Sequence, residues 1–165
     1  MTAFIHIGTS GWHYDHWKGR YYPEDLSTSD QLAHYADEFD SVEINNSFYQ
    51  MPSENTLRTW KETVPEGFRF SVKASRYITH MKKLKDPEEP VANFYERMEG
   101  FLDRVGAVLF QLPPNFGCNP ERLTAFLEAL PDEGPVPVFE FRDPELVHGG
   151  GVRPVARAQG GVLHL

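Results

Sequence analysis

Short apolar runs alternate along this chain with segments in which apolar residues recur three and four positions apart. The short runs are rich in β-branched and aromatic residues, which is typical of strands. They cover residues 4–8, 41–45, 68–73, 107–112 and 136–142. The spacing in the other segments predicts amphipathic helices within residues 32–39, 57–64, 94–105 and 123–130. The order βαβαβαβαβ predicts a parallel sheet whose strands are joined by crossover helices.

Polar residues gather near the carboxyl ends of the predicted strands. In the stretch 41–49, side chains alternate between two faces, so Glu43 and Asn45 share the side opposite to the apolar residues. Corresponding positions elsewhere hold Ser10, Lys73, Gln111, Glu140 and Arg142. In a (β/α) barrel such groups converge on one rim, whereas an open doubly wound sheet gathers them at a single switch point. The distribution favours an α/β, TIM-barrel-like fold, incomplete at about five to six of the usual eight strands.

Length and charge narrow the classes of function. The 165 residues suffice for one domain with a core, and the single cysteine, Cys118, excludes an internal disulfide framework. Because neither an apolar run of membrane-spanning length nor a signal-peptide pattern occurs, we expect a cytoplasmic protein without a membrane partner. The net charge of −8 argues against general nucleic-acid binding, but it is compatible with a local basic pocket.

Five motifs give the chain a family resemblance. They are GTSGWHYDHWKGRYYP (8–23), SVEINNSFYQMP (41–52), FRFSVKASRYITH (68–80), VLFQLPPNF (108–116) and FEFRDP (139–144). Together they resemble the YecE-like proteins, the group called domain of unknown function 72. The resemblance implies a TIM-barrel-like fold, in agreement with the order of elements, and it implies no particular activity.

Charged and polar groups at the predicted rim are the candidate site. Glu43 and Glu140 are the candidate catalytic residues, because paired carboxylates suit general acid/base work. Lys73 and Arg142 are candidate holders of an anion such as a phosphate or a carboxylate. The residues expected to orient a substrate are Asn45, His80 and Gln111. The alternative is that the charged groups pair with one another as a structural network.

Aromatic residues lie in the loops that follow the first two predicted strands. Trp12 and Tyr49 are candidate substrate-binding residues, because an aromatic face stacks on a sugar ring or a base. The alternative is that such rings only pack the loops against the core. Cofactors stay unassigned. A divalent metal on Glu, His and Asn side chains is one possibility, although no H-x-H or H-x-x-E spacing stands out. His13 and His16, three positions apart, are either metal ligands or structural and surface residues of the first loop.

These patterns leave three hypotheses for function. The first is an enzyme that acts at the rim on a small polar or anionic substrate, sugar-like or phosphate-like. The second is a non-catalytic module that binds a ligand or nucleic acid, with the basic run 82–85 taking part. The third is an inactive, truncated fragment. The oligomeric state is not predicted.

The composition changes after residue 145. The first 145 residues hold 14 basic and 24 acidic residues, whereas residues 146–165 hold two arginines and no Asp or Glu. Glycines at 149–151 and Pro154 oppose the helix expected after the fifth strand. We therefore divide the chain into a partial barrel domain, 1–145, and an atypical tail, 146–165. The tail is either out of frame or the start of a sixth βα unit, with a strand at 161–165.

We hypothesise that the chain is a C-terminally truncated member of its family, with a frameshift near codon 146. Sequencing the gene past codon 165 should then reveal further barrel strands in one of the three frames. A downstream region that encodes none in any frame would refute this hypothesis.

Overall fold

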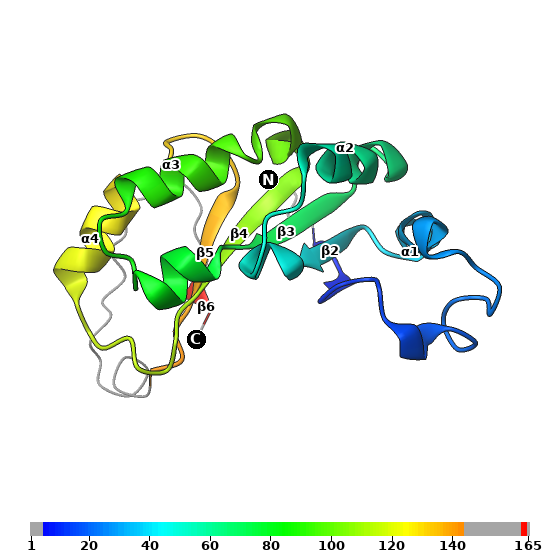
Figure 1. Ribbon diagram of the computed structural model, residues 1–165, viewed down its shortest axis with the longest axis horizontal. Helices are drawn as coiled ribbons and strands as arrows, with labels where there is room; N and C mark the ends of the chain where they lie inside the picture. Colours follow the sequence, from blue (N-terminus) through cyan, green and yellow to red (C-terminus); the bar gives the residue numbers. More distant parts are fainter. Residues whose placement is uncertain (1–4, 144–162, 165) are drawn as a thin grey trace.

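Six parallel strands form one sheet in the order in which they occur in the chain (Figure 1). The computed structural model describes residues 5–143 and 163–164. The strands are β1 (Gly8–Thr9), β2 (Ser41–Ile44), β3 (Arg69–Lys73), β4 (Val105–Gln111), β5 (Val136–Glu140) and β6 (Leu163–His164). The order β1-β2-β3-β4-β5-β6 is that of a (β/α) barrel, because a doubly wound sheet reverses its strand order. The predicted TIM-barrel-like α/β fold, incomplete in its number of described strands, is confirmed.

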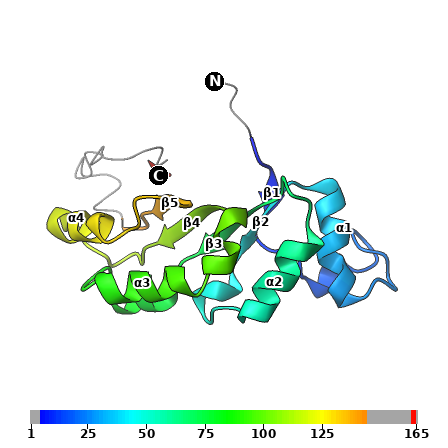
Figure 2. The same cartoon turned by 90° about the horizontal axis from the view of Figure 1, so that it is seen from above.

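Helices connect the successive strands from β1 to β5. The α-helices are α1 (Gln31–Glu38), α2 (Glu54–Thr63), α3 (Glu88–Glu96) and α4 (Pro120–Glu128). Shorter helices are η1 (Asp15–Trp17), η2 (Thr28–Asp30), η3 (Asn46–Phe48) and η5 (Glu99–Arg104), which are 3₁₀, and η4 (Tyr77–Met81), which is a π-helix. Seen from above, α2 and α3 lie along one side of β2, β3 and β4 (Figure 2).

The two faces of the sheet differ sharply in burial. Val42, Phe70 and Phe110 point to the helices and expose 2%, 0% and 0% of their surface. The residues that alternate with them form what we call the open face: Glu43, Ser71, Lys73, Leu109, Gln111, Val138 and Glu140. All of these except Gln111 are only half-buried. Strand alternation therefore puts the apolar residues under the helices and leaves the polar ones accessible.

Aromatic rings fill the layer between sheet and helices. Phe110 packs edge to face on Phe126 of α4, with ring centroids 5.0 Å apart, and stacks on Phe139 of β5 at 5.3 Å. Side-chain caps begin two of the helices: Ser53 Oγ accepts the Thr56 N–H, and Asn119 Oδ1 accepts the Arg122 N–H. Each cap binds a backbone N–H of the first helical turn and so fixes where the helix begins.

The first strand is shorter than the sequence predicts. We expected a strand over residues 4–8, but β1 holds only Gly8 and Thr9, and Ile5 and Ile7 are 80% and 67% exposed. Within the described sheet β1 has one neighbour, β2, so nothing covers these isoleucines. Gly8 is needed where the strands meet, since a Cβ there would lie 1.9 Å from the Ser41 carbonyl oxygen.

The segment after β3 follows an irregular path. Residues 74–90 contain the π-helix η4 and the start of α3. Directly after η4, Lys83, Leu84 and Asp86 adopt positive φ values of 50°, 63° and 43°. Residues other than glycine rarely adopt this left-handed backbone conformation, so packing around the segment must hold its backbone in a strained conformation. Leu84, only 1% exposed, anchors it in the core.

The predicted tail lies mostly outside the described residues. Of the range 146–165, the structure describes Leu163 and His164, which form β6 and pair in parallel with Phe139 and Glu140 of β5. A sixth strand at this position agrees with the range 161–165 expected from the sequence. The proposed division at residue 145 stays a prediction.

Replacing Phe110 with alanine should lower the free energy of unfolding by about 3–5 kcal/mol. The substitution removes a fully buried ring and leaves a cavity between β4 and α4. Equilibrium urea unfolding followed by circular dichroism measures the change. Ile5→Ala, at an exposed site, is the control and should change stability by less than about 0.5 kcal/mol. Equal effects of the two substitutions would contradict this description of the core.

Candidate functional site

A first polar cluster lies at the ends of β1 and β2. Ser10 Oγ donates a hydrogen bond to Glu43 Oε1 at 2.7 Å, and Asn45 Nδ2 donates to Ser10 Oγ at 2.6 Å. The expectation that Glu43 and Asn45 share one side agrees with their common partner. Glu43 makes no other hydrogen bond to a described residue, so Oε2 remains available to a ligand. Ser10 was noticed only as a rim residue, because a single serine after a strand carries no signal of this contact.

A second cluster lies at the ends of β4 and β5. Gln111 Nε2 donates to Glu140 Oε2 at 2.7 Å, and Arg142 Nε donates to Glu140 Oε1 at 2.5 Å. Both carboxylate oxygens are therefore occupied. Burial by itself raises the pKa of Glu140, but the hydrogen bonds from Gln111 and Arg142 and the nearby positive charges outweigh it. The net result is a lowered pKa, which keeps Glu140 ionised at neutral pH.

Lys73 and His80 lie between the two clusters and share Phe48 of η3 as a neighbour. Lys73 Nζ lies 5.0 Å from the centroid of the Phe48 ring, and the His80 ring meets Phe48 edge to face, also at 5.0 Å. Thr79 Oγ1 lies 2.9 Å from His80 Nδ1. Among the described residues, no carboxylate forms an ion pair with Lys73. The amine is therefore half-buried on an aromatic face without a counter-ion from this part of the chain.

Positive charge surrounds His80. Burial of the ring lowers the pKa of His80 below its ordinary value of 6.5. Neighbouring cations lower it further and belong, in decreasing order of effect, to Arg76, Lys73, Arg142 and Lys83. A neutral imidazole among four cations is an environment that favours a bound anion, because each cation gains from a negative partner.

The two candidate catalytic carboxylates lie apart in the sheet. Glu43 is on β2 and Glu140 on β5, with β3 and β4 between them. Three strand spacings amount to roughly 14 Å along the sheet. Carboxylates that flank one glycosidic bond are about 5–10 Å apart. This spacing favours separate roles for the two groups, and their catalytic assignment stays a prediction.

An aromatic pocket opens beside the first cluster. Its volume is about 560 Å³, and it is lined by Trp12, Glu43, Asn45, Asn46 and Trp60, among others. Trp12 and Trp60 pack edge to face, with centroids 5.0 Å apart and planes at 89°. Trp12 is thus both a packing residue and part of a pocket wall.

The other aromatic residues of the loops behave differently. Tyr49 is 79% exposed and contacts the Phe48 ring, outside the pocket wall. Trp17, Tyr21 and Tyr22 contact one another and the core beneath α1. Packing of the loop against the core, the alternative given above, therefore describes these three rings.

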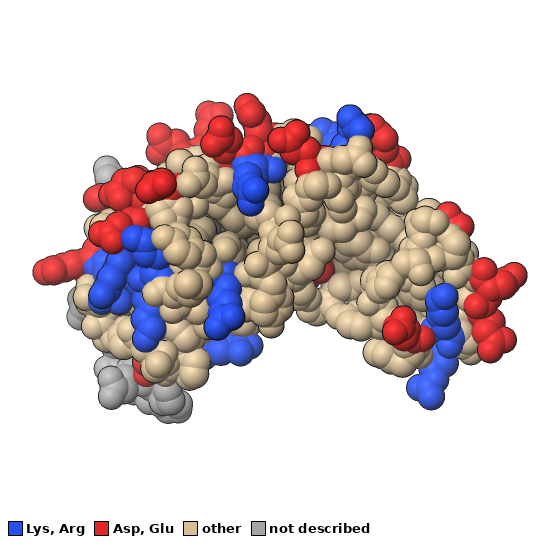
Figure 3. Space-filling model, in the orientation of Figure 1, with Lys and Arg blue, Asp and Glu red and all other residues tan. Residues whose placement is uncertain are grey.

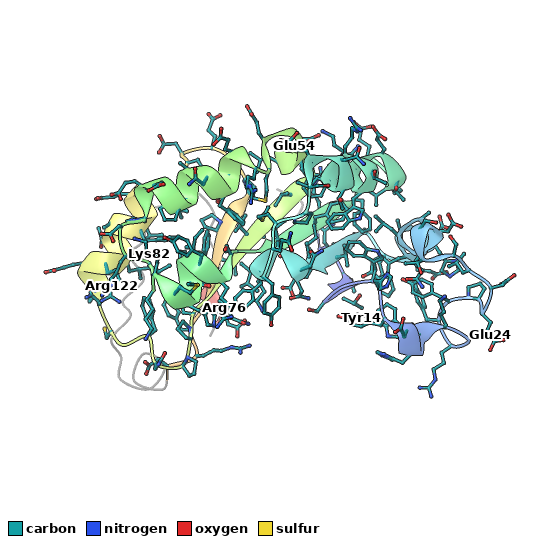
Figure 4. The ribbon with its side chains drawn as sticks, viewed as in Figure 1. Tyr14, Glu24, Glu54, Arg76, Lys82 and Arg122 are labelled. Atoms are coloured by element: carbon teal, nitrogen blue, oxygen red, sulfur yellow. The ribbon has the colours of Figure 1, made fainter. Side chains whose placement is uncertain are left out.

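Basic side chains also gather on the outer surface around η4. In Figure 3, Lys and Arg cover the left of the molecule, over η4 and the start of α4, while Asp and Glu line the upper edge over α3. Figure 4 labels three of them, Arg76, Lys82 and Arg122. Lys82 is paired with Asp86 at 3.0 Å, and Lys83 Nζ donates to the Asn115 carbonyl at 2.9 Å. Arg76 has neither kind of contact within the described part of the chain.

A metal site does not emerge from the described residues. Within residues 5–143 and 163–164, no three His, Cys, Asp or Glu side chains gather closely enough to hold a metal ion. His13 and His16 are both exposed in the first loop. None of the helices described is long and apolar enough to cross a membrane.

Comparison with known proteins assigns the chain to a family. The family model described as "Protein of unknown function DUF72" matches residues 6–160. The chain belongs to the DUF72 family. The resemblance read from the five motifs is thereby confirmed.

Relatives within DUF72 are longer than this chain. The UPF0759 protein YecE of Escherichia coli K12 is 33% identical over 132 residues, which cover 78% of this chain and 45% of YecE. The UPF0759 protein YunF of Bacillus subtilis is 31% identical over 146 residues, which cover 84% of this chain and 51% of YunF. The chain thus spans about half the length of these relatives.

Solved structures of the DUF72 family share this fold. The crystal structure of a member from Thermotoga maritima matches with a TM-score of 0.71 and 31% identity, over 84% of this chain and 56% of that one. A member from Enterococcus faecalis, 24% identical, matches with a TM-score of 0.66 over 87% of this chain and 52% of its own. At this lower identity the likeness shows the fold alone.

Acid should destabilise the protein partly through Glu140. A lowered pKa means that the folded state favours the ionised carboxylate, so this stabilisation is present above the unfolded pKa of about 4.3 and is lost as pH falls through the folded pKa. Glu140→Gln should therefore lose less unfolding free energy than the parent between about pH 5 and pH 3. Urea unfolding at each pH measures this. Glu128→Gln, on the exposed face of α4, is the control, and parallel curves for parent and Glu140→Gln would contradict the assignment.

Proposed function

We propose that this protein binds a small anionic ligand at the carboxyl ends of β2 to β5 and acts on it as an enzyme. The observation that carries the proposal is the position of the Lys73 amine, which lies 5.0 Å from the centroid of the Phe48 ring that His80 also contacts. Lys73 and Arg76 lack an acidic partner in the described part of the chain, although the whole chain has a net charge of −8. Lys73 is half-buried, whereas Arg76 is exposed. A half-buried cation such as Lys73 is costly without a counter-charge, so an anionic ligand would supply the missing negative charge.

Different residues would hold different parts of the ligand. Lys73 offers three donors on a flexible stem. Arg142 bonds to Glu140 through Nε, and its two terminal nitrogens donate to no other described residue. Gln111 fixes Glu140, and through it the direction of Arg142. His80, neutral at pH 7, can donate or accept one proton beside the anion.

Glu43 is the better candidate for a general base than Glu140. Both oxygens of Glu140 already accept hydrogen bonds, whereas Glu43 has a free Oε2 and lines the pocket. Once a turnover assay is in hand, Glu43→Gln, which preserves shape, should lower kcat by about 100-fold or more with little change in KM. Unchanged kcat in this variant would remove Glu43 from the chemistry and support a non-catalytic binding module.

Nucleic-acid binding is the second candidate, favoured by the basic surface around η4. Exposed Tyr77 lies in this surface and could stack on a base. However, Lys82 and Lys83 already have partners, which leaves few free cations for a polyanion. A ten-nucleotide single-stranded DNA should therefore bind no more tightly than small dianions do at matched ionic strength.

Sulfate should raise the pKa of His80. A dianion bound among the cations would offset their charge and favour the protonated imidazole. Sulfate is a suitable probe because it does not titrate near neutral pH. NMR titration of the histidine signals in sodium sulfate, compared with sodium chloride of equal ionic strength, measures the shift, with exposed His16 as an internal control.

The substitution Lys73→Met distinguishes sulfate binding at a specific site from general screening of charge by the salt. Methionine keeps an unbranched chain against Phe48 but removes the charge. It should weaken sulfate binding by about tenfold or more, because a hydrogen bond to a charged group contributes about 1.5–3 kcal/mol. Lys85→Met, at an exposed position, should leave it unchanged. Equal His80 titrations in the two salts would refute the anion site.

A further inference from the structure

The aromatic pocket lies between the first loop, α1 and α2, and it reaches the open face at Glu43. Glu43 pairs in register with Ser71, and Lys73 follows two residues later on the same face of β3. With strands about 4.8 Å apart and a rise of about 3.3 Å per residue, the Cα atoms of Glu43 and Lys73 are about 8 Å apart. One small ligand can therefore reach both the pocket and the amine.

Helix η3 joins the two regions. The first residue of η3, Asn46, lines the pocket. The ring of its last residue, Phe48, contacts both the Lys73 amine and the His80 ring. Ser47 is buried between Asn46 and Phe48, and its single hydroxyl hydrogen is shared between the Ile44 and Lys73 carbonyls, at 2.9 Å and 2.7 Å from Oγ. These bonds tie the end of β2 to the end of β3, so the pocket and the cations keep a fixed relative position.

The chemistry of the pocket fits a hydroxylated ring better than a purely apolar group. Glu43 Oε2, which has no partner among the described residues, can accept a hydrogen bond from a ligand. The exposed Asn46 amide, which bonds to no described side chain, can both donate and accept. The planes of Trp12 and Trp60 are at 89°, so one of the two rings contacts the other through its edge. The two flat faces of that edge-on ring are not covered by the other tryptophan. Aromatic faces pack on the C–H face of a sugar while carboxylate and amide groups bind its hydroxyls.

The size of the pocket agrees with this class of ligand. Its volume of about 560 Å³ lies within the range of about 300–1,000 Å³ that small-molecule sites occupy. Phosphate is the anion whose two negative charges best match the cations around His80, and arginine and lysine are its usual partners.

We propose that the ligand is a phosphorylated sugar, with its ring in the pocket of Trp12, Glu43 and Asn46 and its phosphate at Lys73, Arg76 and Arg142. This proposal rests on the anion site proposed above and adds the ring-binding half. Asn46 is assigned as a residue that recognises the sugar hydroxyls.

Calorimetric titration of the full 165-residue chain with three probes tests the inference. The probes are inorganic phosphate, D-glucose and D-glucose 6-phosphate, at constant ionic strength. The sugar phosphate should bind at least tenfold more tightly than phosphate alone, and glucose alone should bind weakest. Asn46→Ala should remove most of this difference and leave phosphate binding unchanged, whereas Asn93→Ala, an exposed asparagine on α3, should change neither.

The outcomes separate the two proposals. Equal affinity for phosphate and the sugar phosphate would overturn the ring-binding half and leave the anion site in place. Binding of neither would overturn both. A sugar-phosphate preference that survives Asn46→Ala would overturn the assignment of the pocket, because Asn46 is the freely available amide on its wall.

Discussion

The alternation of side chains across β2 to β5 is the constraint on which the rest of this structure depends. Each strand turns one set of residues to the helices, and that set is almost entirely apolar and buried, as at Val72 and Val108. Shifting any strand by one residue would exchange the two sets and bury Lys73 or Glu140 under helices. The hydrophobic layer therefore fixes the register, and the register fixes where the charged groups stand.

Parallel pairing adds the second half of this constraint. All strands run the same way, so their carboxyl ends meet at one edge, and residues from distant parts of the sequence become neighbours there. Gln111 and Glu140, 29 positions apart, pair in register and bond directly. Ser10, which follows the last residue of β1, and Glu43 of β2 are 33 positions apart and also bond directly. The site is a consequence of the sheet rather than of any local motif.

This dependence explains what could be predicted from the sequence. Strands β2 to β5 and helices α1, α2 and α4 follow from hydrophobic period and capping residues, which act locally. The polar rim follows from the strand ends. The shortness of β1 could not be foreseen, because the pattern of Ile5 and Ile7 is that of a strand and only the lack of a covering layer in the described structure overrides it.

Other features depend on contacts that no local pattern records. The π-helix η4 and the left-handed residues after it are held by distant packing, such as the burial of Leu84, rather than by the propensities of their own residues. The distance between Glu43 and Glu140 depends on the strand order, with β3 and β4 between them. The sequence shows only that each residue lies at a strand end and does not show how many strands separate the two.

The distribution of charge bears on the size of the ligand. Acidic side chains line the upper edge of the molecule over α3, while the cations stand at the strand ends and around η4 (Figure 3). At physiological ionic strength the potential decays over about 8 Å, so a small dianion beside Lys73 interacts mainly with the nearest cations. A long polyanion would extend past them to the acidic surface and meet repulsion there. An acidic protein with a small cationic centre is thereby suited to a compact anion, and the pocket next to Lys73 limits which compact anions fit.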